Sequence, residues 1–157
     1  MYWWNIKALA SELKSGKVSP FEKFKYFFAF MLVTSIFVEL IYLFPLPESP
    51  TLFDYASSIL VILITILGLI LCYKSNKKGD NKDFIERFVC LSWPITIRLI
   101  VIIIAISVPY YLVIGDSLVE VTTIVDVLFI IGYESAFYFW IYRHISQISA
   151  TKKGKKA

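Results

Sequence analysis

Four long apolar runs dominate this chain, and each has about the 20 residues that a helix needs to cross the hydrocarbon core of a bilayer. They cover residues 25–44, 52–73, 84–113 and 121–143. A lipid-exposed backbone must satisfy its own hydrogen bonds, and these runs lack the alternation of polar and apolar residues that barrel strands require. The sequence therefore predicts an all-α integral membrane protein with four transmembrane helices in an antiparallel bundle.

The basic residues predict the orientation, because the cytoplasmic flanks of short loops retain Lys and Arg. Of the 16 basic residues, all but Arg98 lie before or in the first residues of the first and third runs, or at the end of the fourth run and after it. The connections around Glu48 and from Asp116 to Glu120 contain none. Both termini are therefore expected in the cytoplasm, and the isoleucine- and lysine-rich usage favours a bacterial inner membrane.

Composition agrees with a membrane location, since 58% of the residues are hydrophobic and 17% are aromatic. Soluble domains contain about 45–50% apolar residues. The net charge of +4 is explained by topology and by attraction to anionic headgroups of the lipid bilayer. We therefore expect no nucleic-acid partner.

Residues 1–18 are expected to form a short amphipathic helix outside the transmembrane domain of residues 19–145. Its apolar side contains Trp3, Ile6, Leu9 and Leu13. Such a helix would lie on the cytoplasmic leaflet or bind in a groove of a partner protein. Residues 146–157 are predicted to be a basic, disordered tail.

Three short motifs have the pattern of a helix start, in which a hydroxyl side chain is followed three residues later by an acid. They precede the first, second and fourth spans: Ser19-Pro20-Phe21-Glu22, Thr51-Leu52-Phe53-Asp54 and Ser117-Leu118-Val119-Glu120.

Ionisable residues inside the runs are the candidates for function, because each costs about 2.5–3.5 kcal/mol unless it is paired or hydrated. At a rise of about 1.5 Å per residue, Arg98 and Glu134 lie at similar depth, and Glu39 and Asp126 lie in the outer half. Arg98 is expected to pair with Glu134, with Glu39 joining or replacing it. The surplus of acids would otherwise line a wet cavity that opens outward.

Pro94 and Pro109 interrupt the third run, and Pro94 lies one turn before Arg98. A proline removes a backbone hydrogen bond and bends a helix. The bend either adjusts the packing of this helix or acts as a gating hinge.

Catalytic and metal-binding constellations are not evident in the sequence. His144 is the single histidine, and it is expected near a helix C-terminus at the surface, whereas Cys72 and Cys90 are too few for a zinc site. We therefore expect no enzymatic activity, no cofactor and no metal.

Two functions remain. The first is a homo-oligomeric anchor or sensor that recruits a cytosolic protein, and by architectural analogy alone it suits an envelope-stress or anti-phage system. Its docking surface would be formed by the basic residues of the inner loop: Lys74, Lys77, Lys78, Lys82 and Arg87. The alternative is a cation or proton channel, or an ion-coupled carrier, in which Glu39, Asp126 and Glu134 form the path. In that case Arg98 would be a gate or counter-charge.

Overall fold

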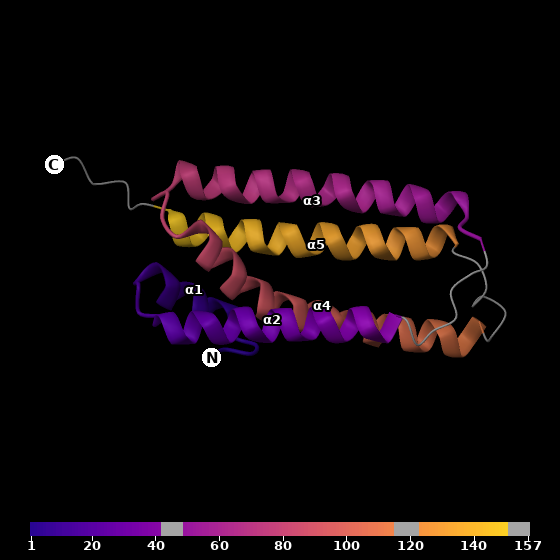
Figure 1. The fold of residues 1–157 in the computed structure, drawn as a ribbon, viewed down its shortest axis with the longest axis horizontal. Helices are drawn as coiled ribbons and strands as arrows, with labels where there is room; N and C mark the ends of the chain where they lie inside the picture. The colour runs from indigo at the N-terminus through magenta and orange to yellow at the C-terminus, as the bar shows by residue number, and fades with distance from the viewer. Residues whose placement is uncertain (42–48, 115–122, 151–157) are drawn as a thin grey trace.

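The computed structural model describes residues 1–41, 49–114 and 123–150 (Figure 1), and all regular structure within them is helical. There are five helices in these residues: α1 (Ile6–Lys14), α2 (Pro20–Ile41), α3 (Leu52–Lys78), α4 (Phe84–Ile114) and α5 (Ile124–Ser149). The predicted all-α class is confirmed. The loop around Glu48, the segment from Asp116 to Glu120 with its predicted helix start, and the tail from residue 151 lie outside the described residues.

Three of the helices are long and apolar enough to cross a membrane: Leu52–Lys78, Phe84–Tyr110 and Ile124–Ser149. They match the second, third and fourth predicted spans, and they support an integral membrane protein. The first run forms α2, which carries Glu22, Lys23 and Lys25 in its first turns and Glu39 near its end. It is not among the three candidate spans, so the crossing by α2 stays a prediction.

Local side-chain hydrogen bonds form at the starts of α3, α5 and α2, and the sequence predicts those at α3 and α2. Thr51 and Asp54 form the expected capping box of α3, in which Asp54 Oδ2 accepts from Thr51 N at 2.7 Å. Helix α5 starts with a box that the sequence analysis did not identify, formed by Thr123 and Asp126. At α2, Ser19 Oγ accepts from Glu22 N at 3.2 Å. These side chains accept hydrogen bonds from backbone N–H groups that have no partner within the helix. They therefore set where the helices begin.

Successive long helices alternate in direction, as in the predicted antiparallel bundle, but in the described residues two of the three contacting pairs of long helices are parallel (Figure 1). Helices α3 and α5 lie side by side and run in the same direction, as do α2 and α4, and α4 also packs against α5 (Figure 1). The order in space is thus α3, α5, α4, α2. Gly68 explains the closest pair, since a Cβ there would lie 2.3 Å from Cγ of Tyr138 on α5. The Tyr138 ring occupies the space that the missing side chain leaves.

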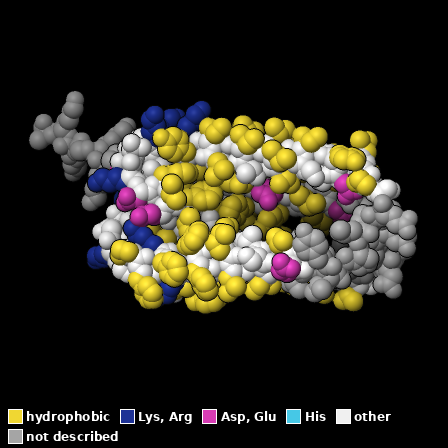
Figure 2. All heavy atoms as spheres, in the orientation of Figure 1, with side chains coloured by type: hydrophobic (Ala, Val, Ile, Leu, Met, Phe, Trp, Pro, Cys, Tyr) yellow, Lys and Arg dark blue, Asp and Glu magenta, His cyan; other side chains and the backbone are white. Residues whose placement is uncertain are grey.

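The buried core lies at one end of the molecule, where α1 packs on α4 and α5. This end also contains the α3–α4 turn and the last turns of α5 (Figure 1). Lys and Arg side chains gather at this same end, whereas apolar side chains cover the helices between the two ends (Figure 2). We call it the basic end. The predicted location of this end in the cytoplasm rests on the positions of the basic residues and stays a prediction.

Candidate functional site

Arg98 binds the N-terminal segment of the chain instead of pairing with Glu134. Its Nη2 donates to the backbone oxygen of Trp4, and its guanidinium lies 5.0 Å from the centre of the Trp4 ring. The predicted Arg98–Glu134 ion pair is therefore wrong. The long side chain reaches from α4 toward the basic end, where a carbonyl and an aromatic face are available, as long cationic side chains commonly do.

Glu134 lies half-buried on α5 and has no ion-pair or hydrogen-bond partner among the described residues. The aromatic side chains of Tyr133 and Tyr138 lie near it on the same helix. Among the predicted acids, Glu134 is half-buried without a hydrogen bond or ion pair in the described residues, whereas Glu39 is exposed. Such a carboxyl group in an apolar helix is costly, so it marks a functional candidate.

The other two predicted acids are not brought to Glu134. Asp126 completes the capping box of α5, where its Oδ2 accepts from Thr123 N at 2.8 Å and from Thr123 Oγ1 at 2.7 Å. Glu39 is exposed on α2. A cavity of about 450 Å³ does lie between α4 and α5, but its described lining is apolar, with Leu99, Ile106 and Phe129 among its residues. The cavity between α4 and α5 is thus not the acid-lined one that the sequence predicts.

Both prolines lie inside α4, which stays helical through them. Pro94 is buried in the core of the basic end, whereas Pro109 is exposed near the opposite end. Ser92, beside Pro94, donates from Oγ to the carbonyl of Phe88 at 2.8 Å. The burial of Pro94 is consistent with a packing role, and a gating role for either proline stays a prediction.

Arg87 was predicted to belong to the cytoplasmic docking surface, but it is buried and holds the α3–α4 turn together. Its two terminal nitrogens each lie 2.6 Å from an oxygen of Asp80, and Nη1 also lies 2.9 Å from Oδ1 of Asn76. Asn76, buried as well, donates to the carbonyl of Lys82 at 3.1 Å. The Arg87 guanidinium lowers the pKa of the Asp80 carboxyl below its usual 3.8. Arg87 is thus unavailable to a partner, because its charge is taken up inside the turn.

The remaining predicted docking residues do lie on the surface. Lys74, Lys77, Lys78 and Lys82 are all exposed, on the last two turns of α3 and in the turn that follows. Sequence reasoning could have separated Arg87 from them, since Asp80 and Asn76 precede it at positions that a tight turn brings close. The exposed lysines thus form one basic surface, braced from inside by Arg87.

The predicted N-terminal helix forms over Ile6–Lys14, so Trp3 precedes it, and its apolar side is covered by the chain's own helices. Ile6, Leu9 and Leu13 are at most 8% exposed, in contact with α4 and α5. Trp3 stays largely exposed and meets Trp93 of α4 edge to face, with ring centres 5.2 Å apart. Neither the lipid surface nor a partner groove is needed to bury this side, because the basic end supplies an apolar surface of its own.

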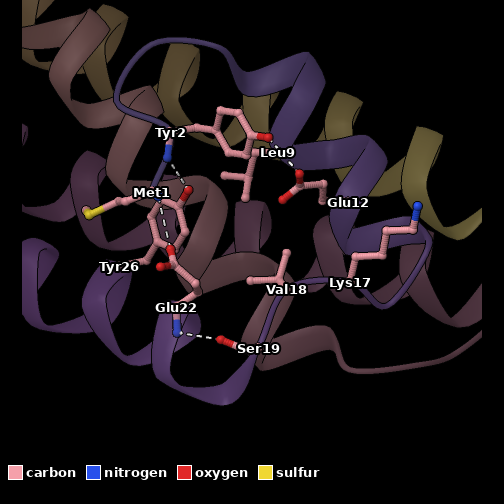
Figure 3. A pocket seen from close by; sticks show the side chains of 9 residues that line it. All are labelled: Met1, Tyr2, Leu9, Glu12, Lys17, Val18, Ser19, Glu22 and Tyr26. Atoms are coloured by element: carbon pink, nitrogen blue, oxygen red, sulfur yellow. Dashed lines mark hydrogen bonds and ion pairs between the residues drawn. The ribbon is translucent and has the colours of Figure 1, made fainter.

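Polar contacts tie the N-terminal segment to α2 around a pocket of about 300 Å³ (Figure 3). Tyr2 N donates to the Tyr26 hydroxyl, and the Tyr2 hydroxyl donates to Glu12 Oε1 at 2.6 Å. The Met1 amino group lies 3.0 Å from Glu22 Oε2. These contacts come from residues 1–2, α1 and α2, so they fix the N-terminal segment at the basic end.

Lys14 links α1 to the end of α5. Its Nζ donates to the carbonyl oxygens of Gln147 and Ala150, both at 3.0 Å. The last carbonyls of a helix lack partners within the helix and carry partial negative charge, so a lysine there is stabilising. The predicted boundary of the tail at residue 146 is therefore wrong, because residues 146–149 belong to α5 and Ile148 and Ser149 are buried.

The lone histidine and the two cysteines show no site chemistry in the described residues. Cys72 and Cys90 are free and buried, and no cluster of metal-ligating residues occurs in residues 1–41, 49–114 and 123–150. His144 is partly buried, with an Nδ1 that has no partner among these residues, and so it differs from the surface histidine that we expected.

Comparison with known proteins identifies no relative. No protein family model, curated protein or solved structure matches the chain. The function must therefore be argued from the arrangement of the helices and their charges.

Proposed function

We propose that this protein is a non-enzymatic membrane anchor that presents its basic end to a cytosolic protein partner. The observation that supports this most is the construction of that end. Exposed Lys77 lies in the last turn of α3, and exposed Lys82 lies in the α3–α4 turn that follows. Buried Arg87 braces this segment through Asp80 and Asn76. A rigid surface with fixed charges can recognise an acidic partner at little cost in entropy.

The proposal includes four membrane crossings with both termini in the cytoplasm of a bacterium, and a homo-oligomeric assembly. The pattern of Lys and Arg at one end (Figure 2) supports the orientation. Helices α3 and α5 have an extensive apolar surface, since only 17% of the residues in the most apolar stretch of each are buried. This surface supports contact with lipid or with further copies of the chain. A role in envelope stress or anti-phage defence would use the same surface.

Charge reversal tests the anchor. The Lys77→Glu/Lys82→Glu variant should lose retention of a cytosolic partner, because both side chains would repel an acidic surface. The matched control, Lys7→Glu/Lys17→Glu, makes the same change in charge at exposed positions of the N-terminal segment and should retain the partner. The measurement is quantitative co-purification from membranes of the native host. Equal retention by all three proteins would contradict the proposal.

A channel or ion-coupled carrier is the second candidate, and unpaired Glu134 is the observation that favours it. The predicted partners Arg98 and Asp126 are engaged elsewhere, so a path would need Glu134 from several copies. The test is proton and cation flux into vesicles that contain the protein. Flux abolished by Glu134→Gln in an intact oligomer would favour this candidate, and silent vesicles would exclude it.

A further inference from the structure

The last turns of α3 and α5 form a pocket of about 300 Å³ that includes two lysines of the basic surface, Lys74 and Lys78. We call it the α3–α5 pocket. Its polar lining includes Lys74, Lys78, Ser75 and Ser146, and its apolar lining includes Leu71 and Tyr142. We propose that this pocket binds the phosphodiester headgroup of an anionic phospholipid. The proposal rests on the membrane location, but it does not depend on a protein partner.

The charges around the pocket favour an anion. Lys74 and Lys78 lie one turn apart on the same face of α3, about 6 Å along the helix axis, so both ammonium groups can reach one phosphate. No acidic residue is among the residues that line it. Asp80, the nearest acid along the chain, is neutralised by its two hydrogen bonds from Arg87. The pocket thus has two positive charges, and no nearby acid in the sequence is free to offset them.

The helix ends at the pocket would repel an anion if their carbonyls were free, because a helix C-terminus carries partial negative charge. Lys14 removes much of this repulsion, since it binds the carbonyls of Gln147 and Ala150. Ser149 Oγ also donates to the carbonyl of Ser75 at 3.4 Å. Lys14 therefore adds a third positive charge next to Ala150, which lines the pocket. It also leaves fewer helix carbonyls without a donor.

The shape of the pocket is fixed by close contact between the two helices. A Cβ on Gly79 would lie 2.3 Å from the carbonyl oxygen of Ser149, so glycine is needed for α3 to end this close to α5. Backbone atoms from both helices form this side of the pocket. A preformed pocket binds its ligand without a large entropic cost of ordering.

Exposed leucines along α3 favour a lipid over free phosphate as the ligand of the pocket. Leu67 and Leu71 are 59% and 55% exposed, and they continue the face of Lys74 and Lys78 toward the middle of the candidate span. An acyl chain can lie along the leucines while the headgroup lies between the lysines. Basic pockets between membrane helices on the cytoplasmic side recognise anionic headgroups in this way.

The test is lipid retention by the full-length protein in a mild non-ionic detergent, measured by native mass spectrometry with phosphatidylglycerol and phosphatidylcholine as probes. The Lys74→Gln/Lys78→Gln variant should bind phosphatidylglycerol about 25-fold more weakly, since each lysine near an anionic headgroup contributes about fivefold. Lys77→Gln/Lys82→Gln loses the same charge from the same segment and should stay within about twofold of the unchanged protein. Lys74→Arg/Lys78→Arg should restore binding.

Three outcomes would overturn the proposal. Equal weakening by the two glutamine variants would mean general attraction to a basic surface, and equal retention of phosphatidylcholine would mean that the anion is not recognised. Displacement of the lipid by inorganic phosphate at the concentration of the lipid would identify free phosphate as the ligand. Both lysines are exposed, so the variants are expected to fold, and a thermal unfolding curve in the same detergent checks this. Unchanged partner retention by Lys77→Glu/Lys82→Glu, together with the expected lipid result, would contradict only the anchor.

Discussion

At the scale of single residues, each buried or half-buried guanidinium finds its oxygen partner at the basic end. Arg98 binds the Trp4 carbonyl, and Arg87 binds Asp80 and Asn76. Trp4 belongs to the N-terminal segment, Asp80 to the α3–α4 turn and Asn76 to the last turns of α3. An arginine inside an apolar run therefore need not mark an ion path, because its long side chain can bind a backbone carbonyl of a neighbouring segment.

The Asp80–Arg87 pair should make the stability of the protein depend on acid pH. Asp80→Asn removes the charge that faces buried Arg87, and we expect a loss on the order of 2 kcal/mol in the free energy of unfolding at neutral pH. The pKa of Asp80 is lowered in the folded state, so the contribution is present above the ordinary value of 3.8 and disappears as the pH falls below it. Unfolding by increasing fractions of a denaturing detergent measures both effects.

Asp83→Asn is the control for this experiment, since Asp83 is exposed in the same turn and asparagine tolerates its positive φ of 45°. It should leave stability within about 0.5 kcal/mol. The pair would be shown not to brace the turn if Asp80→Asn were as stable as Asp83→Asn. The stability of Asp80→Asn would then also depend on acid pH in the same way as that of the unchanged chain.

At the scale of elements, α1 behaves as part of the folded core. Leu9 is fully buried against the bundle, so Leu9→Lys should detach α1, because an ammonium group cannot be buried there without a partner. Backbone amides of residues 6–14 should then exchange hydrogen at least tenfold faster, as measured by mass spectrometry in detergent. Ser11→Lys, at an exposed position of the same helix, should leave exchange unchanged. Fast exchange already in the unchanged protein would contradict the docking of α1.

The α3–α5 contact depends on the absence of a side chain at Gly68. Gly68→Ala places a methyl group against Cβ and Cγ of Tyr138, so the helices must separate, at a cost of about 1–3 kcal/mol. Gly132→Ala, also within a long helix, meets no atom within 4 Å and should be neutral or stabilising by up to about 1 kcal/mol. Thermal unfolding of the two variants in one detergent compares them. Equal unfolding temperatures would rule out tight packing at Gly68.

At the scale of the whole molecule, the crossing by α2 decides between three spans and four. Ser11 and Ser49 are exposed at the two sides of α2, so single cysteines there report its topology. With four spans, Ser49→Cys should react with a membrane-impermeant thiol reagent in intact cells, and Ser11→Cys only after permeabilisation. Cys72 and Cys90 are replaced by alanine beforehand. Reaction of both positions from one side would mean that α2 does not cross.

Much of the fold could be predicted from the sequence, because helix formation in an apolar run is dictated locally by backbone hydrogen bonding. The cap at Thr51 followed from spacing alone, and so did the helix and apolar side of residues 6–14. The site was predicted less well. Equal depth suggested a contact between Arg98 and Glu134, but depth does not fix which way a side chain points around its helix axis.

By itself, the sequence determined the helical class, the candidate membrane spans and the gathering of basic residues at one end, since these follow from composition and period along the chain. The tertiary structure decided which helices pair, where α1 binds and which charges meet. It placed α3 beside α5 in parallel through Gly68, covered α1 with α4 and α5, and turned Arg87 inward. The pairing of the helices and the docking of α1 depend on contacts between residues far apart in sequence, whose energies no local pattern contains. The position of Arg87 depends on the short α3–α4 turn, which brings Asp80 and Asn76 to it.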